Sequence, residues 1–312
     1  MARIATLTLN PTIDGSSDAA TVQPTHKVRT VNERFDPGGG GINVARVLAR
    51  LGADVEAVYL AGGVTGPVLG GLLDRAGLPH RVVPIAGDTR ISLAVHELQS
   101  GKEYRFVPQG PLVSEAEAAA CLALVEQLDC QWLVLSGSLP RGLPDDFYAR
   151  IVATARARGM AVVLDTSGAA LKATLAAGGL RLVKPSLGEL EAFAGRKLDS
   201  ETEIVAAAGE IVTSGGAESV AVSMGHRGAI LVEAAGSLAL PAIPAEARSA
   251  VGAGDSFVAG MTHALAAGWD SHRAFRLGIA AGTAAVLTPG TDLCHRADIG
   301  RMAAMLGIDA LP

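Results

Sequence analysis

The sequence is poor in cysteine, aromatic residues and charge. Its 312 residues include three cysteines, with 4 % aromatic and 18 % charged residues. Cys121, Cys130 and Cys294 are odd in number and form no CxxC pair, which argues against a disulfide framework or structural zinc and favours a reducing cytoplasm. So few aromatic residues supply no stacking platform for nucleic acid, and a net charge of −5 argues against a basic nucleic-acid-binding face.

The chain also lacks long apolar runs and a leader pattern. No run reaches the roughly 18 apolar residues that cross a bilayer. Met1-Ala2-Arg3 leads directly into a strand-like segment instead of an apolar signal core. These absences predict a cytoplasmic protein with no membrane partner, and a hydrophobic content of 49 % predicts a sizeable buried core.

Short β-branched runs alternate with Ala/Leu-rich helical patterns. This alternation predicts an α/β fold with a doubly wound, mainly parallel sheet flanked by helices, in one domain over 1–312. The predicted strands are 3–9, 54–60, 131–135, 161–164, 181–183, 218–222 and 229–232. The predicted helices include 41–51, 115–128, 145–158 and 201–213. After 232 the pattern is mainly helical, in 254–267, 271–287 and 296–306.

Two segments, 90–97 and 103–107, instead alternate apolar and polar residues. A period of two with one polar face predicts an antiparallel hairpin with one exposed side. Further strands are expected between 21 and 35. We therefore predict a small β-sheet lid, formed by segments of about 12–35 and 88–108 inserted in the main domain.

Polar or glycine-rich turns follow six of the predicted strands. They lie at 10–14, 61–63, 136–138, 165–168, 184–186 and 223–225. Open α/β sheets bind ligands at the carboxyl ends of their strands. These turns therefore predict one crevice along one edge of the sheet.

The segment 249–255 runs directly into a predicted helix. Gly252, Ala253 and Gly254 leave backbone amides uncovered at the helix N-terminus, where an anion is held well. A bound phosphate would repel Asp255 in the same turn, unless that carboxylate accepts a proton beside a transferring phosphoryl group. A helix N-cap is the alternative interpretation of Asp255.

A glycine run at 38–41 precedes another predicted helix and Asn43. It departs from the dinucleotide fingerprint, and the chain contains no P-loop motif. The run is either a flexible turn or a backbone brought close to a polyhydroxy ligand, to which Asn43 offers both a donor and an acceptor.

Several charged residues have two interpretations. Asp14 forms an Asx-turn or a cap, or it accepts hydrogen bonds from sugar hydroxyls. Lys27, Arg90 and Arg105 are ordinary surface cations or, with the two arginines on the lid, a cluster that meets a phosphate. Glu189 is a solvated helical residue or orients water on a magnesium ion.

Taken together, these motifs resemble the PfkB family of ribokinase-like carbohydrate kinases. The resemblance is carried by 6–11, 37–45, LSGSLP at 135–140, LVKP at 182–185, VGAGDS at 251–256 and 280–285. The four glycines before Ile42-Asn43, with Tyr104-Arg105-Phe106, resemble the 6-phosphofructokinase branch of the family.

The resemblance implies a role for each matching residue. Asp255 would be the catalytic base, and the amides of Gly252, Ala253 and Gly254 would form an anion hole. The implied sugar contacts are Asp14, Gly39, Gly40 and Asn43, and the implied contacts to its phosphate are Lys27, Arg90, Arg105 and Ser138. The implied ATP contacts are Lys184, Ser186, Ser223, Gly225, Gly228 and Thr283.

The resemblance also implies two metal ions. Mg²⁺ would accompany ATP and meet Glu189 through water. K⁺ would be bound by Ser249, Val251, Ala285, Thr288 and Gly290. The chain departs from the family at Ser186, where the N-x-x-E motif has Asn, at Ala250, where relatives usually have Thr, and at Asp292, where relatives have Arg.

The implied activity is ATP-dependent phosphorylation of the 1-hydroxyl of fructose 6-phosphate, giving fructose 1,6-bisphosphate and ADP. The implied assembly is a homodimer through the lid. Tagatose-6-phosphate kinase and 1-phosphofructokinase are alternatives within the same family. A non-catalytic sensor of sugar phosphate or nucleotide is an alternative of another class, and the intact 252–255 motif argues against it.

Overall fold

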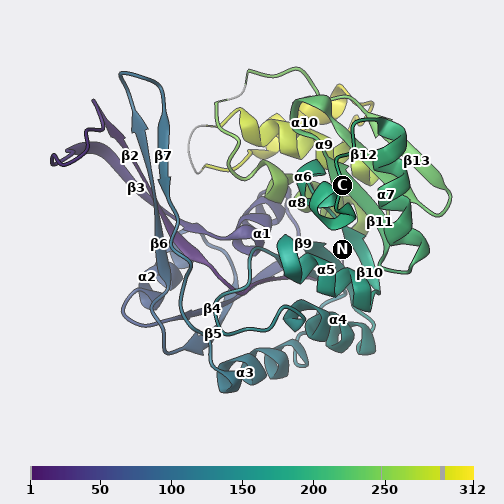
Figure 1. Ribbon diagram of the computed structural model, residues 1–312, viewed down its shortest axis with the longest axis horizontal. Helices are drawn as coiled ribbons and strands as arrows, with labels where there is room; N and C mark the ends of the chain where they lie inside the picture. The colour runs from purple at the N-terminus through teal and green to yellow at the C-terminus, as the bar shows by residue number, and fades with distance from the viewer. Residues whose placement is uncertain (1, 247, 289–291) are drawn as a thin grey trace.

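The computed structural model describes residues 2–246, 248–288 and 292–312. Within these ranges a nine-stranded sheet lies at the centre of the molecule, and a four-stranded sheet stands to one side of it (Figure 1). The strands of the large sheet are β1 (Ile4–Thr8), β4 (Val55–Gly62), β5 (His80–Ile85), β8 (Trp132–Ser136), β9 (Ala161–Asp165), β10 (Leu180–Val183), β11 (Ala217–Ser223), β12 (Ala229–Glu233) and β13 (Gly236–Leu240).

The large sheet has the order β13-β12-β11-β10-β9-β8-β1-β4-β5. Its strands run parallel from β11 to β5, and β12 and β13 are antiparallel additions at one edge. The prediction of a mainly parallel sheet is confirmed. The described chain after 232 is mainly helical, as expected. The prediction missed β5 and β13, the two edge strands; the two-residue turn before β13, Ala234-Ala235, carries none of the Asn or Gly signals of a tight hairpin.

Helices cover both faces of the large sheet, as a doubly wound fold requires. One face carries α1 (Gly40–Leu51), α2 (Gly66–Arg75), α8 (Ala253–Ala266), α9 (Ser271–Val286) and α10 (Arg296–Ala304). The other carries α3 (Glu115–Val125), α4 (Phe147–Ala157), α5 (Gly168–Ala177), α6 (Leu187–Ala194) and α7 (Glu201–Thr213). Successive strand residues alternate between the two cores: Ile4 packs in the first, and Ala5 in the second. In the described ranges, no helix has the length and apolarity needed to cross a membrane.

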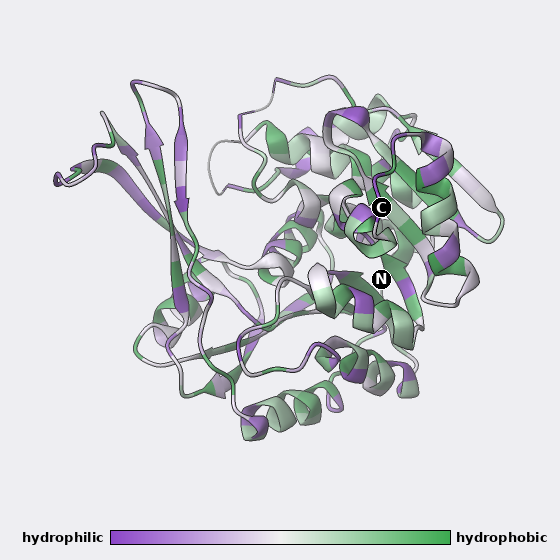
Figure 2. Cartoon of the chain, in the orientation of Figure 1, coloured by the Kyte–Doolittle hydropathy of each residue, from purple (hydrophilic) through white to green (hydrophobic). Residues whose placement is uncertain are grey.

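The lid consists of β2 (Thr12–Ala19), β3 (Thr30–Gly38), β6 (Arg90–Glu97) and β7 (Glu103–Phe106), in the order β3-β2-β6-β7. The predicted β6–β7 hairpin is confirmed. By contrast, β2 begins within the segment expected to be a turn, and it pairs in parallel with β6. Tertiary pairing therefore extends Thr12 and its neighbours into a strand. Figure 2 shows the large-sheet strands as mostly hydrophobic and the lid strands as mixed, as expected for a lid that is open to solvent.

Candidate active site

The N-terminus of α8 forms a tight turn that places Asp255 in the first helical turn. Gly252 has φ +73°, and a Cβ there would lie 2.5 Å from Leu293 Cδ2, so only glycine fits without strain. The Ala253 amide donates to the Ala250 carbonyl at a long 3.4 Å, and helical bonding starts with the Ser256 amide, which donates to the Gly252 carbonyl at 2.8 Å. The turn thus sets the first amides of α8 at the edge of the cleft.

Asp255 has surroundings that suit a proton acceptor. Asn43 Nδ2, on α1, donates to Asp255 Oδ2 at 2.9 Å. Burial and the negative charge of Asp165 raise the pKa of Asp255 to about 7, against the hydrogen bond from Asn43 and the charge of Lys184, which lower it. A carboxyl group with a pKa near neutrality can both accept and release a proton at ordinary pH.

Asp255 lines two pockets of different character. The larger, which we call the lid pocket, has a volume of about 780 Å³ and lies between the lid and the 250–252 loop. The smaller, which we call the acidic pocket, has a volume of about 280 Å³ and is also lined by Asp165 and Glu189. A group bound in one pocket can therefore meet a group bound in the other at the Asp255 carboxylate.

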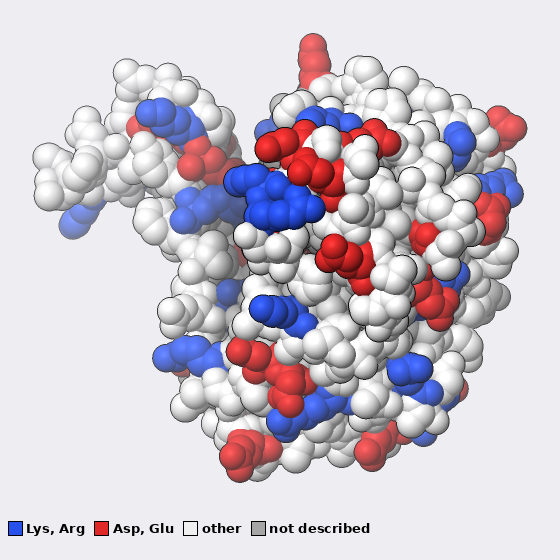
Figure 3. Space-filling model, turned by 45° about the vertical axis from the view of Figure 1, so that its right-hand side comes forward, with Lys and Arg blue, Asp and Glu red and all other residues white. Residues whose placement is uncertain are grey.

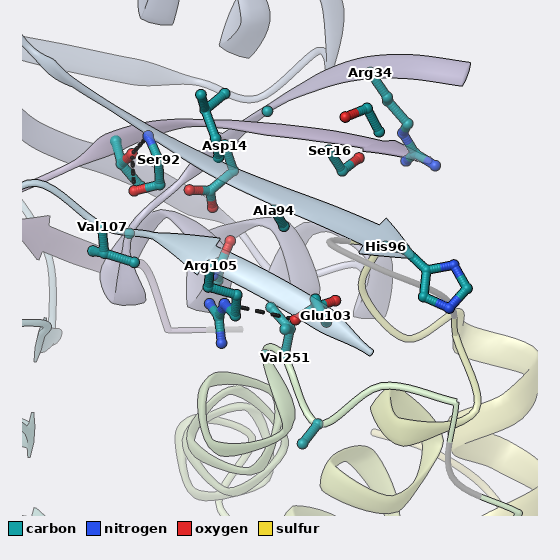
Figure 4. Close-up of a pocket in the computed structure, with 18 of the residues that line it drawn as sticks. Asp14, Ser16, Arg34, Ser92, Ala94, His96, Glu103, Arg105, Val107 and Val251 are labelled. Carbon is teal, nitrogen blue, oxygen red and sulfur yellow. Dashed lines mark hydrogen bonds and ion pairs between the residues drawn. The ribbon is translucent and has the colours of Figure 1, made fainter. Parts of the chain in front are cut away.

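The lid pocket brings together five of the predicted sugar-site residues, Asp14, Gly39, Asn43, Arg90 and Arg105. In Figure 4 Asp14, on β2, lies near Ser92, on the neighbouring strand β6, and Arg105 projects from β7, the next strand of the same lid sheet. Burial raises the pKa of Asp14, opposed by a hydrogen bond from Thr12 and by the charge of Arg105.

The glycine run is structured, because its backbone packs against the ends of two strands. Gly38 ends β3 and Gly40 begins α1. A Cβ on Gly38 would lie 1.9 Å from Asp14 Oδ2, and one on Gly40 would lie 2.3 Å from Ser136 Oγ. The interpretation as a flexible turn is therefore wrong. Packing within the protein alone therefore excludes a side chain at these two positions.

Of the four predicted phosphate contacts, Arg90 and Arg105 share the lid pocket, and the other two lie outside it. Arg90 reaches the lid pocket, but its guanidinium donates to the carbonyl groups of Pro11, Pro108 and Asn10 at 3.3, 2.9 and 2.8 Å. Arg90 thus holds together the base of the lid. Ser138 lines the acidic pocket instead. Lys27 is exposed in the segment that joins β2 to β3, outside the linings of both pockets.

The acidic pocket adjoins a buried ion pair. Lys184 is 5 % exposed, and its Nζ lies 3.2 Å from Asp165 Oδ1. Burial alone would lower the pKa of Lys184, but the charges of Asp165 and Glu189 outweigh it and raise that pKa. A Cβ on Gly254 would lie 3.5 Å from Lys184 Nζ, so the ammonium group stands beside the α8 turn. Sequence reasoning assigned no role to Asp165. Its place at the carboxyl end of β9 was the available signal.

Residues 8–298 match the model of the pfkB family carbohydrate kinases. The chain belongs to this family. It is 44 % identical over 301 residues to the ATP-dependent 6-phosphofructokinase isozyme 2 of Mycobacterium tuberculosis, covering 96 % of this chain and 88 % of the relative. It is 38 % identical over 265 residues to a 1-phosphofructokinase of Xanthomonas campestris, covering 83 % of each.

Solved structures of Escherichia coli phosphofructokinase-2 have the same pfkB fold. The potassium complex has a TM-score of 0.95 at 40 % identity, and the fructose-6-phosphate complex has 0.93 at 39 % identity. Each covers 98 % of this chain and 100 % of the solved chain. The expected ribokinase-like architecture is therefore confirmed.

Ser186 replaces the family Asn in a capping box. Its Oγ accepts from the Glu189 amide at 3.3 Å, and Glu189 Oε2 accepts from the Ser186 amide at 2.7 Å. Serine and glutamate three residues apart form this motif well, so the N-terminus of α6 is capped with serine at this position. Glu189 Oε1 is the carboxylate oxygen outside this motif.

None of the six predicted ATP contacts is among the residues that line the two pockets. Lys184 and Ser186 are bonded to the lining residues Asp165 and Glu189, and the other four are Ser223, Gly225, Gly228 and Thr283. Ser223 pairs with Ser186 in an isolated parallel bridge. Gly228 has φ +98°, and a Cβ there would lie 2.1 Å from the Leu240 carbonyl oxygen, so packing also requires glycine at this pfkB position.

The predicted potassium ligands lie around the C-terminal end of α9. The Ser249 amide donates to the Val286 carbonyl at 3.4 Å, and the Val251 amide donates to Ser249 Oγ at 3.2 Å. Thr288 Oγ1 lies 2.7 Å from the Ala285 carbonyl oxygen. Gly290 lies outside the described residues. The described part of the chain holds no group of three or more His, Cys, Asp or Glu side chains arranged for a metal.

Proposed function

We propose that this chain transfers the γ-phosphate of ATP to the 1-hydroxyl of fructose 6-phosphate, giving fructose 1,6-bisphosphate and ADP. The observation that carries this proposal is the place of Asp255, between a lid pocket large enough for a sugar phosphate and a pocket suited to nucleotide phosphates. A volume of about 780 Å³ also falls in the usual range for small-molecule sites. The names of the relatives support the choice of substrate.

The lid pocket offers suitable partners to a phosphorylated sugar. Asp14 would accept hydrogen bonds from sugar hydroxyls, and Asn43 has donor and acceptor groups on one amide. The backbone at Gly39 and Gly40 would lie close to the sugar. Arg105, half-exposed on the lid, would bind the 6-phosphate through charge-assisted hydrogen bonds.

Asp255 would take the proton of the sugar's 1-hydroxyl group. At the same time the hydroxyl oxygen would form a bond to the γ-phosphorus of ATP, and the bond between that phosphorus and the leaving ADP would break. The amides of Gly252, Ala253 and Gly254 would stabilise the negative charge on the transferring group. Lys184 would add a positive charge from the other side of the turn. The near-neutral pKa of Asp255 suits this proton transfer.

The donor set of the acidic pocket suits Mg²⁺ bound with ATP. Carboxylates are hard oxygen ligands, and Mg²⁺ keeps several waters while it binds phosphates. Glu189 and Asp165 would hold Mg²⁺ through water, and the ion would neutralise phosphate charge.

The remaining predicted contacts concern ATP and K⁺. ATP would be contacted by Ser186, Ser223, Gly225, Gly228 and Thr283. Carbonyl and hydroxyl oxygens of Ser249, Val251, Ala285 and Thr288 would offer K⁺ a site near the turn.

The outer face of the lid supports a homodimer. Phe35, Leu93 and Phe106 form one row across three strands and are 52 %, 46 % and 58 % exposed. Gly15 lies in the same row, and a Cβ there would lie 2.8 Å from Leu93 Cδ2. If this apolar row lay on a twofold axis, the same row of a second protomer would cover it. Lys27, on the same lid, would reach a sugar phosphate across such an interface.

The location that we propose is the cytoplasm. All three cysteines are unpaired, and Cys121 and Cys294 are buried. Unpaired thiols persist in a reducing compartment. ATP is also available to a kinase there.

A coupled ADP-release assay over several sugars tests the proposed function. With ATP and Mg²⁺, we expect fructose 6-phosphate to give the highest kcat/KM among fructose 6-phosphate, tagatose 6-phosphate, fructose 1-phosphate and fructose. A preference for fructose 1-phosphate would instead support 1-phosphofructokinase activity, which the relative in Xanthomonas campestris favours. Binding without ADP release would support the sensor.

A further inference from the structure

Four arginines of the described chain line the lid pocket, and three of them are held by neighbours. Arg90 donates to three carbonyl groups. Arg34 Nε lies 3.1 Å from Asp36 Oδ2, and its Nη2 lies 4.0 Å from Asp292 Oδ1. Arg105 Nε lies 3.8 Å from a Glu103 oxygen. Each of these guanidinium groups therefore already faces a carbonyl or carboxylate oxygen of the protein.

Arg248 is the fourth, and its side chain is placed differently. Among the described residues, the structure shows no hydrogen bond or ion pair of its guanidinium, and the residue is exposed. Its backbone is fixed all the same, because the Arg248 amide donates to the Val286 carbonyl at 2.7 Å. A fixed backbone with an open cationic side chain is prepared for a ligand that the pocket receives.

The position of Arg248 sets what it would bind. It lies on the loop that leads into the α8 turn, and it lines the same pocket as Arg105. Figure 4 shows this loop, at Val251, opposite β7, which carries Arg105 and Glu103. Figure 3 shows basic groups gathered beside acidic ones where the lid meets the body. An anion between Arg248 and Arg105 would therefore touch both the body and the lid.

We propose that Arg248 binds the phosphate group of the sugar substrate, opposite Arg105. This proposal rests on the proposed function and deepens it. A guanidinium group binds a phosphate through a planar fork of donors, which a free sugar lacks the charge to engage. Arg248 would thus make the enzyme specific for a phosphorylated sugar, and the bound phosphate would draw the lid towards the body.

The test is Arg248→Ala in the full chain, assayed with fructose 6-phosphate and with fructose. We expect KM for fructose 6-phosphate to rise about tenfold to a hundredfold, as for a lost charge-assisted hydrogen bond, with kcat changed less than about twofold. The KM for fructose and for ATP should stay unchanged, and Arg248→Lys should recover part of the loss. The matched control is Arg75→Ala, an exposed arginine on α2 outside both pockets.

Three results would overturn the proposal. An unchanged KM for fructose 6-phosphate would remove Arg248 from the site, and a rise in the KM for ATP instead would assign it to the nucleotide. If Arg248→Ala no longer raises the KM for fructose 6-phosphate when Glu103 is also replaced by Gln, then Arg248 acts by pairing with Glu103 and not by binding the phosphate. Failure of this proposal can be told apart from failure of the proposed function. If the native enzyme turns over fructose 6-phosphate and Arg248→Ala has the same KM for it, only the role of Arg248 is refuted. If the native enzyme turns over none of the sugars, the proposed function is refuted.

Discussion

Replacing Asp255 by Asn tests the central chemical argument. The variant keeps the shape of the side chain, and its amide oxygen can still accept the 2.9 Å hydrogen bond from Asn43. It cannot accept a proton. General base catalysis contributes about 10²- to 10⁴-fold, so we expect kcat to fall by that factor while ATP affinity, measured by calorimetry, changes little.

The pH dependence of the same variant identifies the titrating group. In the free enzyme the pKa of Asp255 is about 7. The basic form does the chemistry, so kcat/KM should rise as the pH increases through about 7. The Asn variant should lose this rising limb, because no proton remains to be removed from residue 255.

The free energy of unfolding should depend on pH in the opposite sense to kcat/KM, falling as the pH rises. The folded pKa of Asp255, about 7, lies above its ordinary value of 3.8. The contribution of this group to stability is therefore complete below about pH 3.8 and is lost as the pH rises through about 7. At 1.36 kcal/mol per pH unit, ionising Asp255 costs the fold at most about 4 kcal/mol. The Asn variant, which carries no charge there, should exceed the native protein in free energy of unfolding, by more at pH 8 than at pH 5.

Urea denaturation at the two pH values, with the ADP-release assay, measures both effects. Asp145→Asn, an exposed carboxylate outside both pockets, is the control for removing one negative charge. Native turnover in Asp255→Asn would refute the base assignment. A variant no more stable at pH 8 than the native protein would refute the burial argument.

Three further changes test the scaffold around the site. Arg90→Ala should lower the free energy of unfolding by at least about 1.5 kcal/mol, because it removes charge-assisted bonds to three carbonyl groups. An unchanged urea midpoint would show that these bonds are dispensable. Gly40→Ala should cost about 1–3 kcal/mol, read as a lower Tm, since its Cβ would lie 2.3 Å from Ser136 Oγ. A Tm equal to that of the native protein would mean that the strand end can shift. Phe35→Asp should dissociate the proposed dimer in light scattering, and an unaltered mass would place the interface elsewhere.

Local sequence patterns were sufficient for much of the fold. Apolar runs separated by helical periods identified most strands of the large sheet, since parallel strands are covered on both faces. They missed the two edge strands of the large sheet, β5 and β13, and they assigned the start of β2 to a turn. These segments are strands because of their partners: β4 pairs with β5, β12 with β13, and β3 and β6 with β2.

The candidate site divides in the same way. The 252–255 turn could be recognised from the sequence because a helix N-terminus with bare amides and one carboxylate is a local chemical unit. The ion pair beside the acidic pocket could not, because Asp165 and Lys184 meet only where β9 and β10 lie side by side. The sequence identified Arg90 as a cation on the lid, but only the fold revealed that its guanidinium donates to three carbonyl groups.

The sequence alone thus determined which chemical groups are present. These are a glycine turn that ends in Asp255, a second glycine run followed by Asn43, and lid segments in which apolar and polar residues alternate. Only the tertiary structure decided how these groups act on one another. Asn43 reaches Asp255 across 212 residues of chain, and Asp165 and burial together bring that acid close to neutrality. Hydrogen bonds and charges depend on separation in space, which the order of residues along a chain does not specify.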